Sequence, residues 1–368
     1  MFKNLRMTRK ICFLSLALIA VSICASRAFA DVPALSLEDC LAIAEGHPSV
    51  AGAAASVASS RGRLASSVTG DRLKIDGSAS AARRYQQNSN ESDSYSLGTT
   101  ASIKLYDANR SKYSVDAARS SLSATEEDAL HTLSSVRSNV KTAYLALLLD
   151  YEIERQRSDS VAAFEQHLEQ AKGFYEAGAK PWYDVTKAEV DLGNAQMSLV
   201  EASSNIRNAK ASLANAVGID PSEGFEIERS GLNILSVPDE AINSAEGLAM
   251  ENRSDYRASA LKMDAGRSTL SSEARSNSPT ISLSGGYNSS AGDTFNFERG
   301  WNTGVSMSIP IVDGGAAKAG VDIAKAQVMT LEASHEKLRQ DIMLEVSNAR
   351  SDITKARERI RISALTLA

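Results

Sequence analysis

The chain repeats itself at a constant offset of 206 residues. Identical residues recur at this offset from residue 61 to residue 143 with no insertion, and they include Arg61/Arg267, Leu64/Leu270, Ile75/Ile281, Gly98/Gly304, Asp107/Asp313, Val115/Val321, Glu126/Glu332 and Ala143/Ala349. Each copy is predicted to contain a helix, two alternating strands and a very long helix. Because solenoid units have only about 20 to 50 residues, the repeat is a duplicated half-molecule.

The first 30 residues have the organisation of a secretory signal peptide. Basic residues precede an apolar run at 11–24, which is too short to span a bilayer, and Ala28-Phe29-Ala30 provides a cleavage site. Lipid attachment at Cys24 is an alternative, but Ile23 occupies a position where lipoprotein signals carry a small residue. Cleavage after Ala30 leaves Cys40 as the single cysteine, which excludes an intramolecular disulfide.

Charge and hydropathy restrict the class of protein. Removal of the signal leaves 35 Lys and Arg against 45 Asp and Glu, a net charge of −10. This charge argues against a nucleic-acid partner, which requires a basic surface. No later segment reaches the length of apolar sequence needed for a membrane-spanning helix. The remaining classes are a periplasmic protein, an exported protein and an outer-membrane β-barrel.

Long helices are predicted to make up most of the chain. Residues 109–173 can form one helix of roughly 100 Å at 1.5 Å per residue. A seam with the 3.5-residue period of a coiled coil follows, formed by Val185, Ala188, Leu192, Ala195, Leu199, Ala202, Ile206, Ala209, Leu213 and Ala216. Between them, Gly178 can end one helix and Pro181 can begin the next, so a hairpin tip is predicted at about 176–181.

Four segments alternate between apolar and polar residues, at about 73–85, 95–107, 279–288 and 300–312. This alternation is typical of outer-membrane strands, although a half-buried strand of a soluble sheet shows the same pattern. Its occurrence in two hairpins of an exported chain favours the membrane interpretation. Five aromatic residues near the expected strand ends are candidates for interfacial girdles, namely Tyr85, Tyr95, Tyr106, Tyr287 and Trp301.

The sequence contains no catalytic or metal-binding constellation. No histidine belongs to a cluster of carboxylate, cysteine or histidine residues at metal-ligand spacing, and no phosphate-binding glycine loop is present. We therefore predict no enzyme activity, no metal and no cofactor. His131, His167 and His335 are predicted to be solvated on charged helices, and His47-Pro48 is predicted to break a helix. The strand-to-helix turns are assigned to Asp107, Asp313, Gly314 and Gly315.

The chain resembles the TolC-type outer membrane efflux proteins. The resemblance is carried by residues 304–315 (GVSMSIPIVDGG), by 174–178 (FYEAG) followed by 183–185 (YDV) and Ala188, and by the duplication. It extends from about residue 35 to residue 368, with Val312 replacing the more usual aromatic residue. The family's second helical hairpin requires a tip and a return helix near 380–430, so we expect this chain to be a truncated version.

The resemblance implies a mostly α-helical fold with β-structure, built from a duplicated helix–strand–strand–helix unit. Three chains would each give four strands to one 12-stranded outer-membrane β-barrel, which continues as a periplasmic α-helical coiled-coil tunnel. A four-stranded sheet alone would leave unpaired edges in lipid, so strands from several chains are also required on physical grounds. The domains are then a signal peptide at 1–30, a first repeat at 31–218, a linker at 219–240 and a second repeat at 241–368 that stops before its hairpin tip.

The implied function is that of an outer membrane channel subunit, a passive export duct in a tripartite type I secretion or efflux system. Its partners would be two further copies, a periplasmic adaptor (membrane fusion protein), an inner-membrane ABC or RND transporter and outer-membrane lipid. It would be located in the cell outer membrane and extend into the periplasm. The alternative is a soluble periplasmic coiled-coil adaptor, which would explain a helical hairpin but not four membrane-type strands.

Two candidate sites lie at the predicted hairpin tip. The resemblance implies that the tip residues Ala177, Gly178, Ala179 and Lys180 dock the adaptor. It also implies that Asp184 is a gate, because the tunnel of the family narrows just after each tip. The local alternative for Asp184 is electrostatic: an acidic residue in the first turn of a helix meets the positive end of the helix dipole, which is worth about 0.3 to 1 kcal/mol.

Overall fold

The computed structural model describes residues 34–367, apart from 87–88, 223, 230–241, 243 and 295. The predicted signal peptide and the second half of the predicted linker lie outside the described residues. The described chain forms two compact units, one from residues 34–47 and 136–229, the other from 48–135 and the residues after 241. The fold is mostly helical with one four-stranded sheet, as the duplicated pattern predicts.

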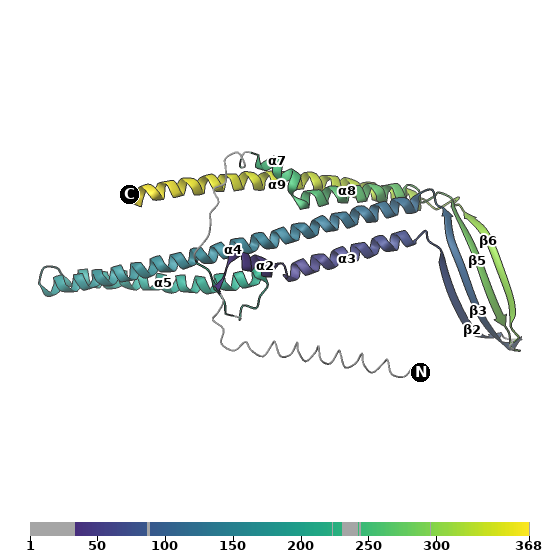
Figure 1. Ribbon diagram of the computed structural model, residues 1–368, viewed down its shortest axis with the longest axis horizontal. Helices are drawn as coiled ribbons and strands as arrows, with labels where there is room; N and C mark the ends of the chain where they lie inside the picture. The colour runs from purple at the N-terminus through teal and green to yellow at the C-terminus, as the bar shows by residue number, and fades with distance from the viewer. Residues whose placement is uncertain are drawn as a thin grey trace, which may run out of the picture. The chain divides into compact units, whose positions relative to one another are not determined.

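A long helical hairpin dominates the first unit (Figure 1). It consists of the C-terminal part of α4 (Arg110–Glu176) and the whole of α5 (Trp182–Val217). The predicted seam is its core, since six seam residues of α5 are buried: Val185, Ala188, Ala195, Ala202, Ile206 and Leu213. Gly218 ends α5 in the left-handed conformation, at φ 86°, and its amide donates to the carbonyl of Ala214.

A small platform packs against this hairpin within the first unit. It comprises β1 (Ala34–Leu35), which runs parallel to β4 (Glu226–Ile227), and α2 (Leu37–Ala44). Two buried tyrosines of α4 hold β4: the Tyr144 hydroxyl donates to the Glu228 carbonyl at 2.8 Å, and the Tyr151 hydroxyl donates to Glu226 Oε2 at 2.9 Å. The segment around β4 is too short to find many backbone partners in a sheet. The two buried tyrosine hydroxyls therefore supply hydrogen bonds to it.

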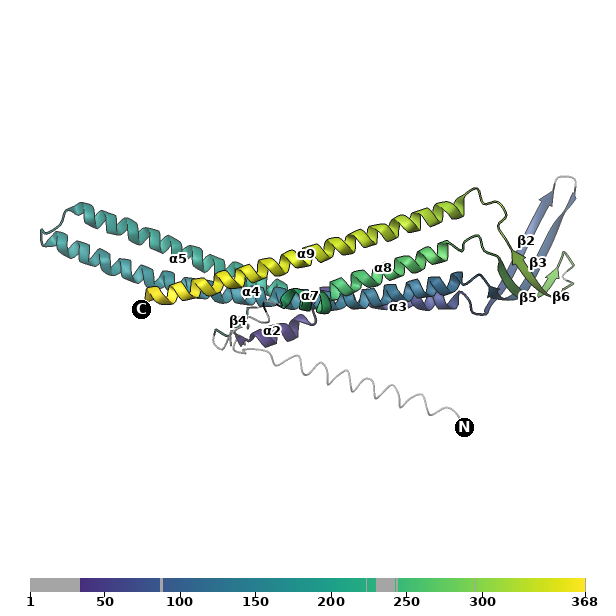
Figure 2. The same ribbon diagram turned by 90° about the horizontal axis from the view of Figure 1, so that it is seen from above.

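The second unit contains α3 (Pro48–Thr69), the N-terminal part of α4, α7 (Ala245–Asn252), α8 (Ser254–Glu273) and α9 (Ala316–Leu367). Helices α8 and α9 run side by side (Figure 2). A Cβ atom on Gly266 would lie 2.7 Å from Leu331 Cδ1, so the missing side chain permits their close approach. None of the described helices combines the length and apolarity needed to cross a membrane.

The duplication is visible in how the helices begin. His47-Pro48 breaks the first helical segment, because α2 ends at Ala44 and α3 begins at Pro48. The same break recurs 206 residues later, where α7 ends at Asn252 and α8 begins at Ser254. No proline is present in the second case, so a shared backbone arrangement rather than one residue type sets the break.

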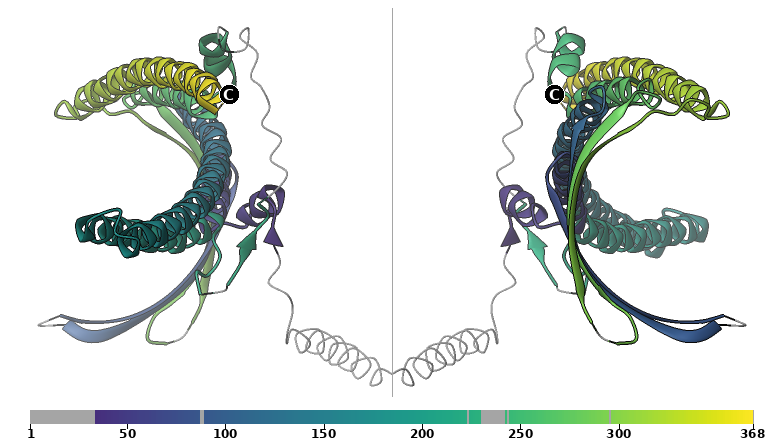
Figure 3. Two further views of the ribbon diagram at one scale, coloured as in Figure 1. Left: turned by 90° about the vertical axis from the view of Figure 1, so that its left-hand side faces the viewer. Right: turned by 90° about the vertical axis from the view of Figure 1, so that its right-hand side faces the viewer.

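Two hairpins join into one antiparallel sheet with the order β2-β3-β5-β6. The strands are β2 (Lys74–Gln86), β3 (Ser89–Tyr106), β5 (Thr280–Ala291) and β6 (Glu298–Ser308). Strand β3 begins earlier than the alternation indicates, because polar residues that read as loop still pair with β2. Strand β6 ends earlier, at Ser308, two residues before Pro310, which lacks the amide needed for a ladder. Figure 3 shows that the sheet is strongly curved.

The register gives the sheet one apolar face. Ile75 pairs with Ala101, Ile103 with Leu283, and Ile281 with Met307. Large apolar side chains on this face are exposed, Trp301 by 78% and Val305 by 67%. Tyr287 and Trp301 are directly opposite each other inside β5 and β6, rather than near the strand ends as predicted.

Candidate functional site

The hairpin tip is closed by a backbone motif that needs a glycine. Helix α4 ends at Glu176, and Gly178 has a φ of 69°. The Ala179 amide donates to the Phe174 carbonyl, and the Gly178 amide donates to the Tyr175 carbonyl, both at 2.9 Å. These two bonds form a Schellman motif, which satisfies carbonyls that the end of a helix leaves without partners. The tip thus presents a short, fixed turn.

Asp184 lies in the first turn of α5, immediately after this tip. Its Oδ2 atom is 3.6 Å from Lys180 Nζ, and its side chain is 33% exposed. The same ammonium lies 5.6 Å from the centre of the Phe174 ring. The N-cap residue of α5 is Pro181, which offers no side-chain hydrogen bond, so Asp184 supplies the negative charge near the helix N-terminus. The structure therefore brings the gate candidate and the tip residue Lys180 together.

A hollow of about 180 Å³ lies beside Asp184 between the two helices of the hairpin, and its lining includes His167, Lys187 and Asp191. Below it, Val185, Ala188 and Ala171 are buried in contact with Leu168. The tip also carries exposed aromatic rings, with Tyr175 and Trp182 in an edge-to-face contact at 5.1 Å between ring centroids. The hairpin near its tip therefore combines a buried apolar core with a polar hollow and an exposed aromatic surface.

The second strand-to-helix corner is organised by the Asp313 carboxylate. It accepts hydrogen bonds from the Gly315 amide at 2.9 Å, the Ala317 amide at 2.8 Å and the Asn277 side chain at 3.1 Å. The Ala317 and Gly315 amides, followed by Asn277, lower the pKa of Asp313. Gly314 and Gly315 both have positive φ, 66° and 91°, so two consecutive left-handed residues make the turn.

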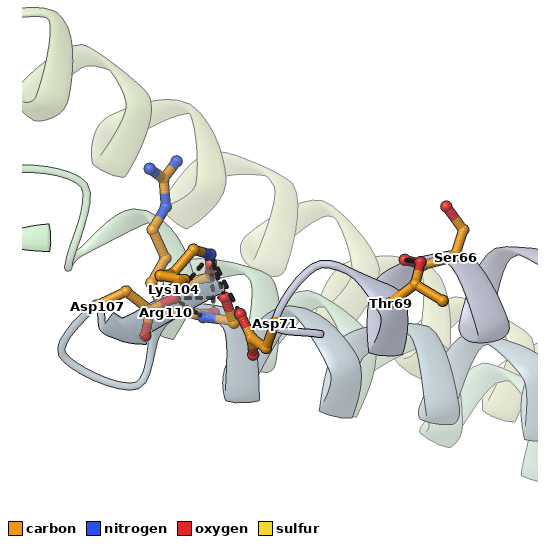
Figure 4. Close-up of polar contacts among 8 residues, drawn as sticks. Ser66, Thr69, Asp71, Lys104, Asp107 and Arg110 are labelled. Atoms are coloured by element: carbon orange, nitrogen blue, oxygen red, sulfur yellow. Dashed lines mark hydrogen bonds and ion pairs between the residues drawn. The ribbon is translucent and has the colours of Figure 1, made fainter. Parts of the chain in front are cut away.

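The first corner has the same backbone but different side chains (Figure 4). Asp107 Oδ2 accepts from the Ser111 amide at 2.9 Å and lies 3.3 Å from Lys104 Nζ. The same ammonium lies 3.2 Å from Asp71 Oδ1. Burial by itself would raise the pKa of Asp107, but hydrogen bonds from the hydroxyl and amide of Ser111, then from Lys104, lower it. Lys104 thus neutralises two neighbouring carboxylates.

Sequence reasoning missed part of this corner. Ala108 and Asn109 have positive φ values of 56° and 65°, although neither is a glycine. Sequence reasoning also did not single out Asp71 and Lys104. The equivalent positions in the second copy are occupied by Asn277 and Pro310. The signal was available in the duplication, since Ala108 and Asn109 align with the two glycines of the second copy.

Three histidines were predicted to be solvated on charged helices, and the structure agrees for two of them. His131 and His167 are exposed. The prediction is wrong for His335, which is half-buried, stacks on Tyr256 at 4.5 Å between ring centroids and has its Nδ1 atom 3.0 Å from Ser259 Oγ. Within the described residues, no group of three or more His, Cys, Asp or Glu side chains is placed to hold a metal ion.

Comparisons with known proteins agree with this architecture. The family described as outer membrane efflux protein matches residues 42–219 and 247–368. The outer membrane protein TolC of Vibrio cholerae is 24% identical over 298 residues, which cover 76% of this chain and 67% of TolC. Protein CyaE of Bordetella pertussis is 25% identical over 290 residues, covering 78% of this chain. The chain spans 54% of the length of CyaE.

The fold is shared with solved structures. The outer membrane protein VceC from Vibrio cholerae superimposes with a TM-score of 0.78 at 18% identity, covering 89% of this chain and 81% of VceC. The family match extends over most of the sequence, in two segments that correspond to the two repeats. The chain belongs to the outer membrane efflux protein family, which is a family of channel proteins.

Proposed function

We propose that this chain is the channel subunit of a tripartite type I secretion or efflux system, through which cargo crosses the outer membrane. The observation that carries the proposal is the four-stranded antiparallel sheet with an exposed apolar face, joined directly to long helices. Apolar side chains such as Trp301 and Val305 favour lipid over water. The family match supports the same assignment.

The sheet also supports assembly from several copies. Among the described strands, β2 and β6 each pair on one side only. Unpaired backbone groups cost several kcal/mol each in hydrocarbon, so both edges need partner strands within the membrane. Three copies would close a 12-stranded barrel, and the helices would continue it as a tunnel in the periplasm. The duct itself is passive, and an inner-membrane ABC or RND transporter supplies the energy.

The helical hairpin fits the docking and gating roles within this function. Its tip, residues 177–180, is closed by backbone hydrogen bonds and lies far along the hairpin from the buried platform residues, so it suits contact with a periplasmic adaptor. Asp184 lies in the next turn and would form a ring of three carboxylates in the trimer. Such a ring favours cations and narrows the tunnel mouth.

The soluble adaptor is the competing function, and the exposed apolar face of the sheet disfavours it. The test uses membranes from cells that express the full chain. Extraction that requires detergent, a trimer in chemical cross-linking and discrete conductance steps in planar bilayers are expected for the channel. Release of a monomer by salt alone, without conductance, would support the adaptor and refute the channel.

A further inference from the structure

We propose that the apolar face of the sheet carries a binding groove for a lipid with a phosphate-bearing headgroup. The Arg299 guanidinium would bind the phosphate, and one acyl chain would lie over the small residues of β2. The inference rests on the proposed function, because it requires the sheet to lie in the outer membrane.

The strand register places Arg299 on the apolar face. One row across the sheet contains Gly77, Thr99, Tyr287 and Trp301, since these residues pair in succession across the four strands. The next row away from the helices contains Ala79, Leu97, Ser289 and Arg299. Paired residues share a face of a sheet, so the guanidinium belongs to the same surface as the large apolar side chains.

This face is hollowed where its residues are small. Two adjoining hollows of about 560 Å³ and 410 Å³ share Ala79 and Leu97 in their lining. The first also includes Gly77 and Arg299, and the second includes Phe297. The volumes lie within the range of roughly 300 to 1,000 Å³ found for small-molecule sites. Together the hollows form an open groove that is mainly apolar beside Phe297 and more polar beside the Arg299 guanidinium.

The Arg299 guanidinium has no partner within the described part of the chain: it makes no ion pair, side-chain hydrogen bond or ring contact there, and the residue is exposed. Arg83, which lies on the same face nearer the loop, is instead paired with Asp93 at 2.7 Å. A guanidinium at a lipid boundary is costly unless an anion pairs with it. Phosphate is the anion that lipid headgroups offer, and it suits the planar fork of arginine.

The depth of Arg299 fits a headgroup position. Its row lies eight residues along β5 from Ile281, the first apolar position of that strand. Eight residues span about 27 Å of strand, or about 20 Å along the membrane normal at a tilt of roughly 40°. The apolar band of such proteins is about 25 Å tall. Tyr287 and Trp301 lie one row deeper, on the helix side of this row. With Ile281 at the inner edge of the band, the Arg299 row lies about 5 Å inside the outer edge, a distance that an extended arginine side chain can reach across.

The experiment is native mass spectrometry of the detergent-solubilised full chain with added lipid A, or with lipid A whose phosphates have been removed. We expect retention of lipid A and at least about tenfold weaker retention of the dephosphorylated form. Arg299→Gln should weaken lipid A binding by a similar factor, and Arg299→Lys should restore most of it. Ala79→Leu, which fills the groove, should weaken binding of both forms.

Arg84→Gln is the matched control, because Arg84 lies near the same end of the sheet but on the opposite face. Equal retention of the two lipid forms, or an equal loss in the Arg84→Gln variant, would overturn the proposal. Planar-bilayer conductance of the same preparations separates the two hypotheses. A chain that conducts without retaining lipid A refutes the lipid groove alone, whereas a chain that retains lipid A without conducting refutes the channel.

Discussion

Asp107 and Asp313 lie 206 residues apart and make the same contact in the two repeats, in each case with the amide four residues later. Asp107 accepts from the Ser111 amide at 2.9 Å, and Asp313 accepts from the Ala317 amide at 2.8 Å. Two residues with positive φ follow each aspartate. The backbone turn from strand to helix is therefore duplicated, although only the second copy uses glycines to make it.

The first prediction concerns this left-handed pair. A non-glycine residue in the left-handed region costs roughly 1 to 2 kcal/mol, whereas glycine loses about 0.5 to 1 kcal/mol more conformational entropy on folding. Ala108→Gly should therefore stabilise the protein by about 0.5 kcal/mol, and Gly314→Ala should destabilise it by about 1 kcal/mol. Thermal unfolding of the detergent-solubilised full chain, followed by circular dichroism, measures both changes.

Gly62→Ala provides the control for this pair of variants. Gly62 lies within α3, has no positive φ and has open space around the position of a Cβ atom. The substitution should stabilise the helix by roughly 0.5 to 1 kcal/mol, the ordinary helix propensity difference. If Gly314→Ala stabilised the protein as Gly62→Ala does, the strained-turn explanation would be wrong.

The second prediction concerns pH. The pKa values of Asp107 and Asp313 are both lowered in the folded protein. Their contribution to stability is therefore complete above the unfolded pKa of about 3.9 and is lost as the pH falls through the lower, folded values. Titration of these two carboxylates should leave the melting temperature almost unchanged from pH 7 to pH 5. At pH values below 4 it should lower the melting temperature.

The double variant Asp107→Asn with Asp313→Asn isolates this effect from the other carboxylates. It should melt below the wild type at pH 7, and the difference in melting temperature should shrink as the pH approaches 2.5. A difference that stays constant over this range would show that the two carboxylates do not titrate in the way inferred.

The third prediction concerns the gate candidate. Asp184→Ala should raise the single-channel conductance or weaken the cation selectivity of the trimer, because it removes three carboxylates from the proposed tunnel mouth. Glu189→Ala is the control, since Glu189 is an exposed acidic residue further along the same helix. If both variants conduct like the wild type, Asp184 is not a gate. Its role is then limited to its electrostatic interactions with the helix dipole and Lys180.

The fourth prediction concerns Cys40, which is fully buried. Burial, reinforced by the Asp39 charge, raises the pKa of its thiol to about 11. At pH 8 only about one thiol in a thousand is then ionised, so alkylation should be very slow. Iodoacetamide should leave Cys40 unmodified in the folded mature chain, where it is the single cysteine after the predicted cleavage, and should label it in urea. Rapid labelling of the folded chain would contradict this burial.

Local patterns in the sequence predicted much of the fold. The seam that includes Val185 and Leu213 is buried in the hairpin, as its 3.5-residue spacing indicates. Gly178 ends the helix at the tip, and the four alternating segments are strands. These features follow from side-chain periodicity and from the conformational freedom of glycine, which act over a few residues and can therefore be recognised in a linear sequence.

The tertiary structure alone decided how the two repeats pair with each other. The pairing of β3 with β5 joins them into one sheet, and it places Arg299 in the same row as Ala79. Likewise, Lys104 meets Asp71 only when the strand returns beside the preceding helix. These relationships depend on backbone hydrogen bonds between residues far apart in the chain. A shift of one residue in that register would move Arg299 to the other face of the sheet, so neither composition nor alternation could specify its place.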